Sequence, residues 1–243
     1  MDVRNPLLCL FALAMLLSIS ACQSHHPEPL VPGDQGATVV VGLIAKNPKV
    51  KSVINRNSLA QQMAQVIRDE SRYQVPVVGL VSQQLGKEAY EHLVVHYSEH
   101  GYLSGADLEA LRRADLGARY AIFARLEFDQ VVEHDAENQQ VYNNQGELLT
   151  DRMHVVSRTD RTTVISAMMV DVVRGASVWH NNFEVTLDSK NIQTLYSGSS
   201  FAGSLAATFT NTLANGIRGP RQPDAPSTAK AMRTLLKEVA KQM

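Results

Sequence analysis

The sequence predicts an α/β domain of the α+β kind, with helices packed on one face of a mixed sheet that ends in a long C-terminal antiparallel meander. Two observations predict this fold. The first half carries a β-branched apolar run followed by segments of helical periodicity, and after Arg119 the apolar period changes from about 3.6 residues to two. Because alternating segments joined by short turns form antiparallel hairpins, the second half is predicted to hold three long strands.

The first expected element is a strand. Residues 37–45 are Ala-Thr-Val-Val-Val-Gly-Leu-Ile-Ala, an apolar run without polar alternation. Such a run is typical of a strand that is buried on both faces, so we expect it near the centre of the sheet. A basic loop is expected over 46–56, an amphipathic helix from Ser58 to about Arg72, and a short strand or loop at 76–80.

Two further helices are expected before the alternating half. The first covers 83–100, where apolar side chains recur at every fourth residue, and Gly101 is placed to end it. Ser104 and Asp107 have the spacing of a capping box, which predicts the start of the next helix. Gly117 is the expected C′ residue of that helix.

Three strands are expected over 119–132, 153–172 and 177–187. A polar connection at 133–150 joins the first two, and a turn at Gly175 joins the last two. The opposite face of these strands carries charged side chains, which are expected either to be solvated or to pair across strands. They are Arg125, Glu127, Asp129, Arg158, Asp160 and Arg161.

Composition divides the chain into five segments. These are a lipoprotein signal peptide at 1–21, a flexible tether at 22–36, a periplasmic α/β domain at 37–188, a low-complexity linker or conditional helix rich in Ser, Gly, Thr and Pro at 189–226, and a C-terminal amphipathic helix at 227–243. The tether is rich in Pro and Gly, which predicts an extended and solvated segment. Ser227 is the expected N-cap of the last helix.

The N-terminal segment indicates where the protein works. Leu7 to Ile19 is an apolar run with the length of a signal-peptide h-region, too short to span a bilayer as a helix. Ile19-Ser20-Ala21-Cys22 resembles the lipobox of bacterial lipoproteins. The resemblance implies cleavage before Cys22, attachment of diacylglycerol to its sulfur and of a further acyl chain such as palmitate to its amino group. Because Gln23 rather than Asp follows Cys22, the resemblance favours anchoring in the outer membrane, with the domain facing the periplasm.

Cysteine usage agrees with this interpretation. The chain has two cysteines, Cys9 and Cys22, and the first lies in the segment that cleavage would remove. The mature domain would then contain no internal disulfide, so its stability has to come from a packed core.

A second resemblance lies in the middle of the chain. The segment 114–120, which leads into a strand, and the later turn at Asp171, Gly175 and Trp179 are similar to a pattern in a group of periplasmic lipoproteins. The group includes the curli-secretion channel protein, the activators of penicillin-binding proteins and the N-terminal domain of the Tol translocation protein. In that group a helix ends at Gly-Ala, here Gly117, and a hairpin Asp-x-x-x-Gly-x-x-x-Trp closes the sheet. The resemblance implies a non-catalytic domain for assembly or partner binding.

Three histidines are the candidate metal ligands of the sequence. His92, His96 and His100 lie at i, i+4 and i+8 of an expected helix, a spacing that lets neighbouring imidazoles share a metal. Zinc peptidases of the His-Glu-x-x-His type carry a glutamate directly after the first histidine, and here that position is Leu93. We interpret the three histidines as residues at the border of an apolar stripe, and a metal-dependent hydrolase stays an alternative.

The remaining composition limits the function classes. The net charge is −1, which provides no bulk basic charge for binding nucleic acid. No phosphate loop, dinucleotide fingerprint or paired-acid motif is present. The sequence therefore predicts a non-enzymatic lipoprotein without a cofactor, acting as a scaffold, regulator or assembly factor that binds envelope proteins or itself. The alternative is an oligomeric secretion or export component in which 189–219 order on assembly.

Overall fold

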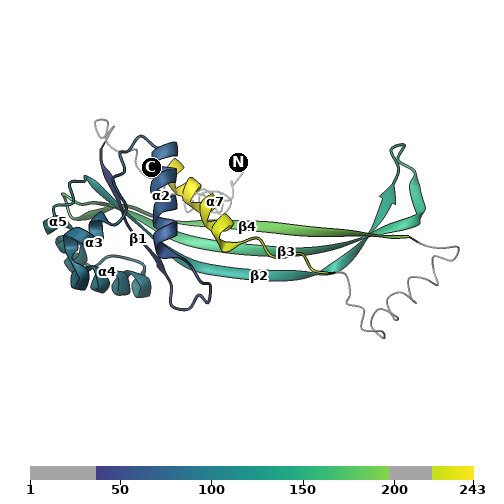
Figure 1. Cartoon of the computed structure of the whole chain (residues 1–243), viewed down its shortest axis with the longest axis horizontal. Coiled ribbons are helices and arrows are strands. Elements are labelled where there is room, and N and C mark those ends of the chain that lie inside the picture. Colours follow the sequence, from purple (N-terminus) through teal and green to yellow (C-terminus); the bar gives the residue numbers. More distant parts are fainter. Residues whose placement is uncertain (1–36, 197–220) are drawn as a thin grey trace, which may run out of the picture. The chain divides into compact units, whose positions relative to one another are not determined.

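The computed structural model describes residues 37–196 and 221–243. Its elements in chain order are β1 (Val39–Lys46), α2 (Arg56–Glu70), α3 (Leu80–Leu85), α4 (Lys87–His100), α5 (Gly105–Arg113), β2 (Tyr120–Tyr142), β3 (Leu148–Asp171), β4 (Ala176–Tyr196) and α7 (Thr228–Lys241). The strands form one sheet in the order β1-β2-β3-β4, in which β1 is parallel to β2 and the other pairs are antiparallel (Figure 1). The predicted fold class, a mixed sheet with a C-terminal antiparallel meander and packed helices, is confirmed.

β1 lies at an edge of the sheet, which corrects the expectation of a central strand. Every residue of the strand except Lys46 is nevertheless buried. The burial comes from helices, since α2, α3 and α4 all contact β1. A continuous apolar run therefore indicates that both faces of a strand are covered. It does not indicate whether the strand has a neighbour on one side or on both.

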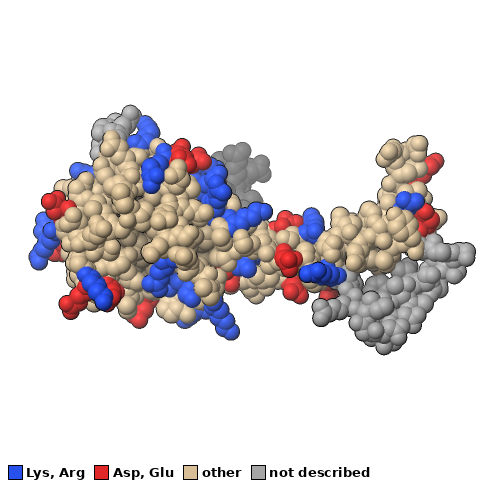
Figure 2. Space-filling view, viewed as in Figure 1, with Lys and Arg blue, Asp and Glu red and all other residues tan. Residues whose placement is uncertain are grey.

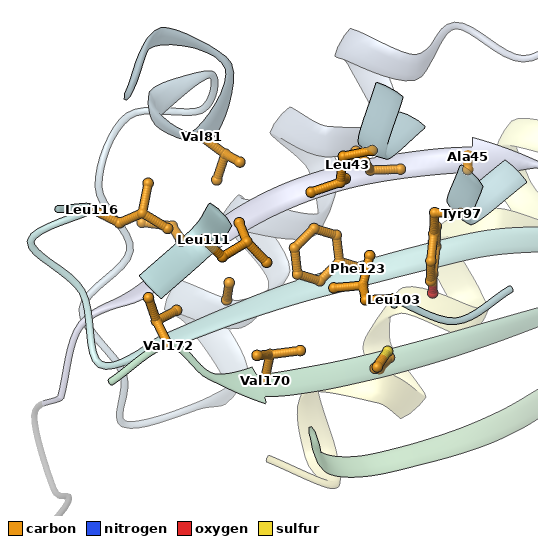
Figure 3. Packing of buried hydrophobic residues seen from close by; sticks show 14 residues of the cluster. Leu43, Ala45, Val81, Tyr97, Leu103, Leu111, Leu116, Phe123, Val170 and Val172 are labelled. Carbon is orange, nitrogen blue, oxygen red and sulfur yellow. The ribbon is translucent and has the colours of Figure 1, made fainter. Parts of the chain in front are cut away.

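One part of the core lies between the sheet and the helices α3, α4 and α5 (Figure 3). Phe123 of β2 is fully buried there, and its ring packs on that of Tyr97 in α4 with centroids 5.8 Å apart. The other buried members are Val40, Leu43, Ala45, Val81, Leu93, Leu103, Leu111, Leu116, Ala121, Met168, Val170 and Val172.

The helices α2 and α7 cover the other face of the sheet. Ile122 alternates with Phe123 along β2 and is also fully buried, so its side chain points to the opposite face. α7 contacts β3 and β4, and α2 contacts α7 and β1. Met63 of α2 and Leu236 of α7 have no exposed surface. Helices therefore cover both faces of the sheet near β1, whereas the sequence predicted one covered face.

The helix expected over 83–100 is two helices. α3 ends at Leu85 and α4 begins at Lys87, with Gly86 between them at φ 77°. A residue with positive φ cannot continue a right-handed helix, and glycine adopts this conformation at little cost. The apolar period continues through the break, which is why the sequence predicted one element.

Helix ends agree with the sequence in part. Gly101 caps α4 at φ 76°, and Ser104 begins α5 with the predicted capping box. α5 ends earlier than expected, with Ala114 as its C-cap. Asp115 follows at φ 43°, and Gly117, at φ 58°, lies in the connection to β2 instead of at C′.

The strands of the meander are longer than expected. β2 continues to Tyr142 and β3 begins at Leu148, so most of the polar segment 133–150 is paired strand. β4 runs past Leu187 to Tyr196, into the segment expected to be low-complexity linker. Strands are recognised in a sequence by alternation of apolar and polar residues, and a segment that is polar on both faces does not show it. The backbone hydrogen bonds of the sheet form all the same, because they require no particular side chain.

Candidate functional site

Part of the meander extends beyond the reach of β1. β1 pairs with β2 only as far as Leu126. Beyond this point β2, β3 and β4 form a three-stranded ladder, which we call the strand extension and define as residues 128–142, 148–164 and 184–196. In the described part of the chain, no further strand pairs with either outer edge of this ladder. The extension thus presents two rows of backbone donors and acceptors.

The strand extension also exposes apolar side chains. Most residues of β2 from Phe128 onward are exposed, and on the visible face the outer part carries few charged side chains (Figure 2). The large apolar residues exposed on the extension are Phe128, Val131, Val132, Tyr142, Leu148, Ile192 and Tyr196. Unpaired strand edges flanked by exposed apolar side chains are suited to pairing with a strand from another chain.

A partly buried ion pair fixes the base of the extension. Arg161 Nη1 of β3 lies 2.7 Å from both carboxylate oxygens of Asp129 in β2, and it also donates to Thr228 Oγ1 at 2.8 Å. The Asp129 side chain is 1% exposed. Burial opposes its charge, but hydrogen bonds from Ser52, Arg161, Thr228 and Thr163 outweigh burial and lower the pKa of Asp129. Thr228 is the first residue of α7, so the node joins two strands to the last helix.

The chain that leads into α7 lies against the extension. Asn191 Nδ2 of β4 donates to the carbonyl oxygen of Arg221 at 2.9 Å. Gln222 Nε2 donates to the carbonyl oxygen of His134 in β2, also at 2.9 Å. These contacts hold the segment before α7 against strands on both sides of β3.

A cavity of about 430 Å³ lies where the C-terminal end of α4 meets the sheet. Arg125 Nη1 donates to Ser98 O at 3.1 Å, and its Nε donates to Glu127 Oε1 at 2.6 Å. Ser166 Oγ donates to the same carboxylate oxygen at 2.6 Å. Burial opposes ionisation of Glu127, but the hydrogen bonds from Arg125, Ser166 and Asn47 lower its pKa. The guanidinium of Arg125 and the carboxylate of Glu127 in this cavity therefore neutralise each other.

The three candidate histidines lie along one side of α4, and two of them approach Asp107. The Nδ1 atoms of His92 and His96 lie 3.7 and 3.0 Å from its carboxylate oxygens, and the rings of His96 and His100 are 4.6 Å apart. Asp107 already accepts hydrogen bonds from Ser104 N and Oγ in the capping box. Among the described residues, no group of three or more His, Cys, Asp and Glu side chains is placed to hold a metal. The hydrolase alternative therefore gains no support from this cluster.

The motif in the middle of the chain forms the β3–β4 turn. Gly175 N donates to Asp171 O at 2.9 Å, and Gly175 has φ 64°. Arg119 Nη2 donates to Asp171 Oδ2 at 2.9 Å, which ties the turn to the start of β2. Trp179 is 7% exposed and packs edge-on against Phe183 with ring centroids 6.5 Å apart. These residues hold the end of the sheet together.

The predicted signal peptide, the tether and Cys22 lie outside the described residues, as do residues 197–219 of the conditional helix. Across 37–196 and 221–243, none of the helices is long and apolar enough to cross a bilayer. Sequence reasoning noted Arg125, Asp129 and Arg161 as possible cross-strand pairs. It missed Thr228, because the N-terminus of the last helix meets β2 only in the folded chain.

No protein-family model matches the sequence, and no curated protein matches it. Among solved structures the chain is similar to the LpoB C-terminal domain from Salmonella enterica, with 12% identity and a TM-score of 0.34 over 62% of this chain and 83% of that one. It is similar to lipoprotein GNA1162 from Neisseria meningitidis, with 15% identity and a TM-score of 0.34 over 75% and 99%. It is also similar to PelC, a dodecamer from Paraburkholderia phytofirmans, with 12% identity and a TM-score of 0.33 over 86% and 89%. At these scores the similarities establish neither a family nor a function.

Proposed function

We propose that the protein is an outer-membrane-anchored periplasmic lipoprotein that acts as a non-catalytic scaffold, regulator or assembly factor for envelope proteins. The observation that carries the proposal is the strand extension, which exposes apolar side chains and whose two outer edges pair with no other strand among the described residues. The lipobox-like sequence that ends at Cys22 supports the membrane anchor. In this function the extension is the surface that meets the partner.

The mode of binding follows from the backbone. A partner segment that adds to an open edge gains main-chain hydrogen bonds, and its alternate side chains meet the exposed apolar residues of the extension. The ion pair of Asp129 with Arg161 keeps the base of the extension fixed to α7. Little ordering of the extension itself is then required on binding, which favours affinity.

Site-directed photo-crosslinking in intact cells tests the partner surface. A photoreactive amino acid at Val131, on the extension, is expected to form covalent adducts with envelope proteins. The control is Val95 of α4, which is also exposed but lies in the helical layer. Adducts from Val95 with none from Val131, or no envelope protein at either position, would contradict the proposal.

The anchor has its own test. Cys22→Ala is expected to abolish metabolic labelling by palmitate and to release the protein from the membrane fraction. Cys9→Ala, in the predicted signal peptide, is the matched control and should change neither. Labelling that persists in Cys22→Ala would overturn the assignment of the lipid to this residue.

The two open edges also support a second candidate, an oligomeric secretion or export component. The free edge of β2 in one copy could pair with the free edge of β4 in the next, a head-to-tail contact that closes into a ring if the rotation permits. Sedimentation of the full-length protein in detergent would then give one defined oligomer. Replacing Val131 and Val132 by lysine is expected to dissociate it, and a monomer at all concentrations would exclude this candidate.

A further inference from the structure

The outer edge of β1 is only partly occupied. At its start, the segment around Gln74 makes a parallel bridge to Thr38, and Val39 N donates to Gln74 O at 2.8 Å. Pro76 follows two residues later and has no N–H to continue such a row. Residues 76–79 leave the edge as a loop, and α3 begins at Leu80. In the described chain, the rest of β1 pairs on one side only, with β2.

A cavity of about 280 Å³ lies along the vacated part of this edge. Its floor includes Gly42, Leu43 and Ile44 of β1. Gly42 is the extra residue of a β-bulge, since Val41 pairs with Ile122 and Leu43 with the next residue of β2. The cavity is slightly smaller than typical ligand pockets of about 300–1,000 Å³, so it suits a short stretch of chain better than a large ligand.

The two walls of the cavity differ in chemistry. The wall formed by α4 is apolar at Val94 and carries the ring of Tyr90, while the wall formed by α2 carries Arg56 and Asn57. Successive side chains of a strand point to opposite faces. A strand placed in this row would therefore turn one side chain toward the α4 wall and the next toward the α2 wall.

The charge of the cavity has one sign. Arg56 is its charged lining residue, and neither aspartate nor glutamate lines it. The positive charge of Arg56 also affects the phenol of Tyr90: burial raises the pKa of Tyr90, and Arg56 opposes that rise. A segment that enters this cavity gains most if it carries carboxylates on the side that faces α2.

We propose that the outer edge of β1 binds an extended segment of a partner protein in which apolar and acidic residues alternate. The segment adds to the sheet as a fifth strand beside Gly42–Ile44, continuing the row that Gln74 begins. Its apolar side chains lie against Tyr90 and Val94, and a carboxylate pairs with Arg56. This site lies at the opposite edge of the sheet from β4 and does not depend on the membrane anchor.

A labelled synthetic peptide in which valine and glutamate alternate tests the proposal by fluorescence anisotropy with the full-length protein in detergent. The same peptide with lysine in place of glutamate should not bind. Arg56→Glu is expected to weaken binding on the order of tenfold or more, the effect of losing one charge-assisted hydrogen bond. Lys230→Glu is the matched control and should leave affinity within about twofold, since it reverses an exposed charge in the first turn of α7.

Two further measurements keep the test decisive. Asn57→Trp fills the cavity from an exposed helical position and should block binding, whereas Gln61→Trp, exposed on the same helix outside the cavity, should not. Amide hydrogen exchange at Gly42–Ile44 should slow when the peptide is bound. No binding of the glutamate peptide, equal binding of both peptides, or affinity unchanged by Arg56→Glu and Asn57→Trp would overturn the proposal. The crosslinks from the strand extension would be unaffected by that outcome.

Discussion

The guanidinium of Arg125 lies directly against Gly101, so that a Cβ atom at Gly101 would stand 2.5 Å from Nη2 and 2.6 Å from Cζ. Arg125 is 9% exposed and donates to the carbonyl oxygen of Ser98, in the last turn of α4. A cation from the sheet thus caps the negative end of a helix, in space that only glycine leaves open. Gly101 therefore has two roles, since its φ of 76° also ends α4.

The first prediction concerns this contact. Gly101→Ala adds left-handed strain of about 1–2 kcal/mol and displaces a buried guanidinium, so we expect a loss of about 2–4 kcal/mol in the free energy of unfolding. Urea denaturation measures it. Gly105→Ala is the control, because nothing lies within 4 Å of the added Cβ and this first residue of α5 has an ordinary φ. Equal stability of Gly101→Ala and the wild type would show that Arg125 does not occupy this position.

The second prediction concerns the base of the strand extension. Asp129→Ala removes a carboxylate that is 1% exposed and leaves the Arg161 guanidinium, which is 16% exposed, without its partner, so we expect a loss of about 1.5–3 kcal/mol in the free energy of unfolding. The free energy of unfolding in urea is the measurement. Asp151→Ala removes an exposed pair with Arg152 and is expected to cost less than about 1 kcal/mol. A loss of similar size in both variants would contradict the buried node.

The third prediction is that the contribution of the Asp129 carboxylate to the free energy of unfolding depends on pH. The pKa of Asp129 in the folded protein lies below its ordinary value of 3.8, because its hydrogen bonds outweigh the effect of burial. Its contribution is therefore present above pH 3.8 and is lost as the pH falls through the folded-state pKa. We expect the difference in unfolding free energy between the wild type and Asp129→Asn to shrink as the pH falls below about 4. A difference that stays constant from pH 6 to pH 2 would contradict this assignment.

The fourth prediction concerns the bulge of β1. A Cβ atom at Gly42 would lie 2.4 Å from Cε1 of Phe123, which is fully buried. Gly42→Ala overfills the core and is expected to cost about 1–3 kcal/mol. In the Phe123→Leu background the same substitution should cost at least about 1 kcal/mol less, because the clashing ring is gone. A double-mutant cycle in urea measures the coupling, and strictly additive losses would show that the two residues do not meet.

Part of the site could be predicted from the sequence. Asp129 and Arg161 lie on two strands that the alternating apolar pattern predicted. Pairing across these strands was one of the two expectations for their side chains. The cavity beside β1 could not be predicted, because its lining comes from β1, α2, α3, α4 and the loop before α3. The strand extension was missed for another reason. Residues 133–150 are polar on both faces, and such a segment carries no hydrophobic period to mark it as strand.

The sequence by itself determined the elements whose local signals agree with their burial. The apolar run of β1, the capping box at Ser104, the glycine that ends α4 and the Ser227 cap of α7 all follow from neighbouring residues. Only the tertiary structure decided that β1 is an edge strand covered on both faces, and that no described strand pairs with the two outer edges of the strand extension. Strand order and edge exposure depend on hydrogen bonds between segments far apart in the chain, and these bonds involve backbone groups that all residues except proline share.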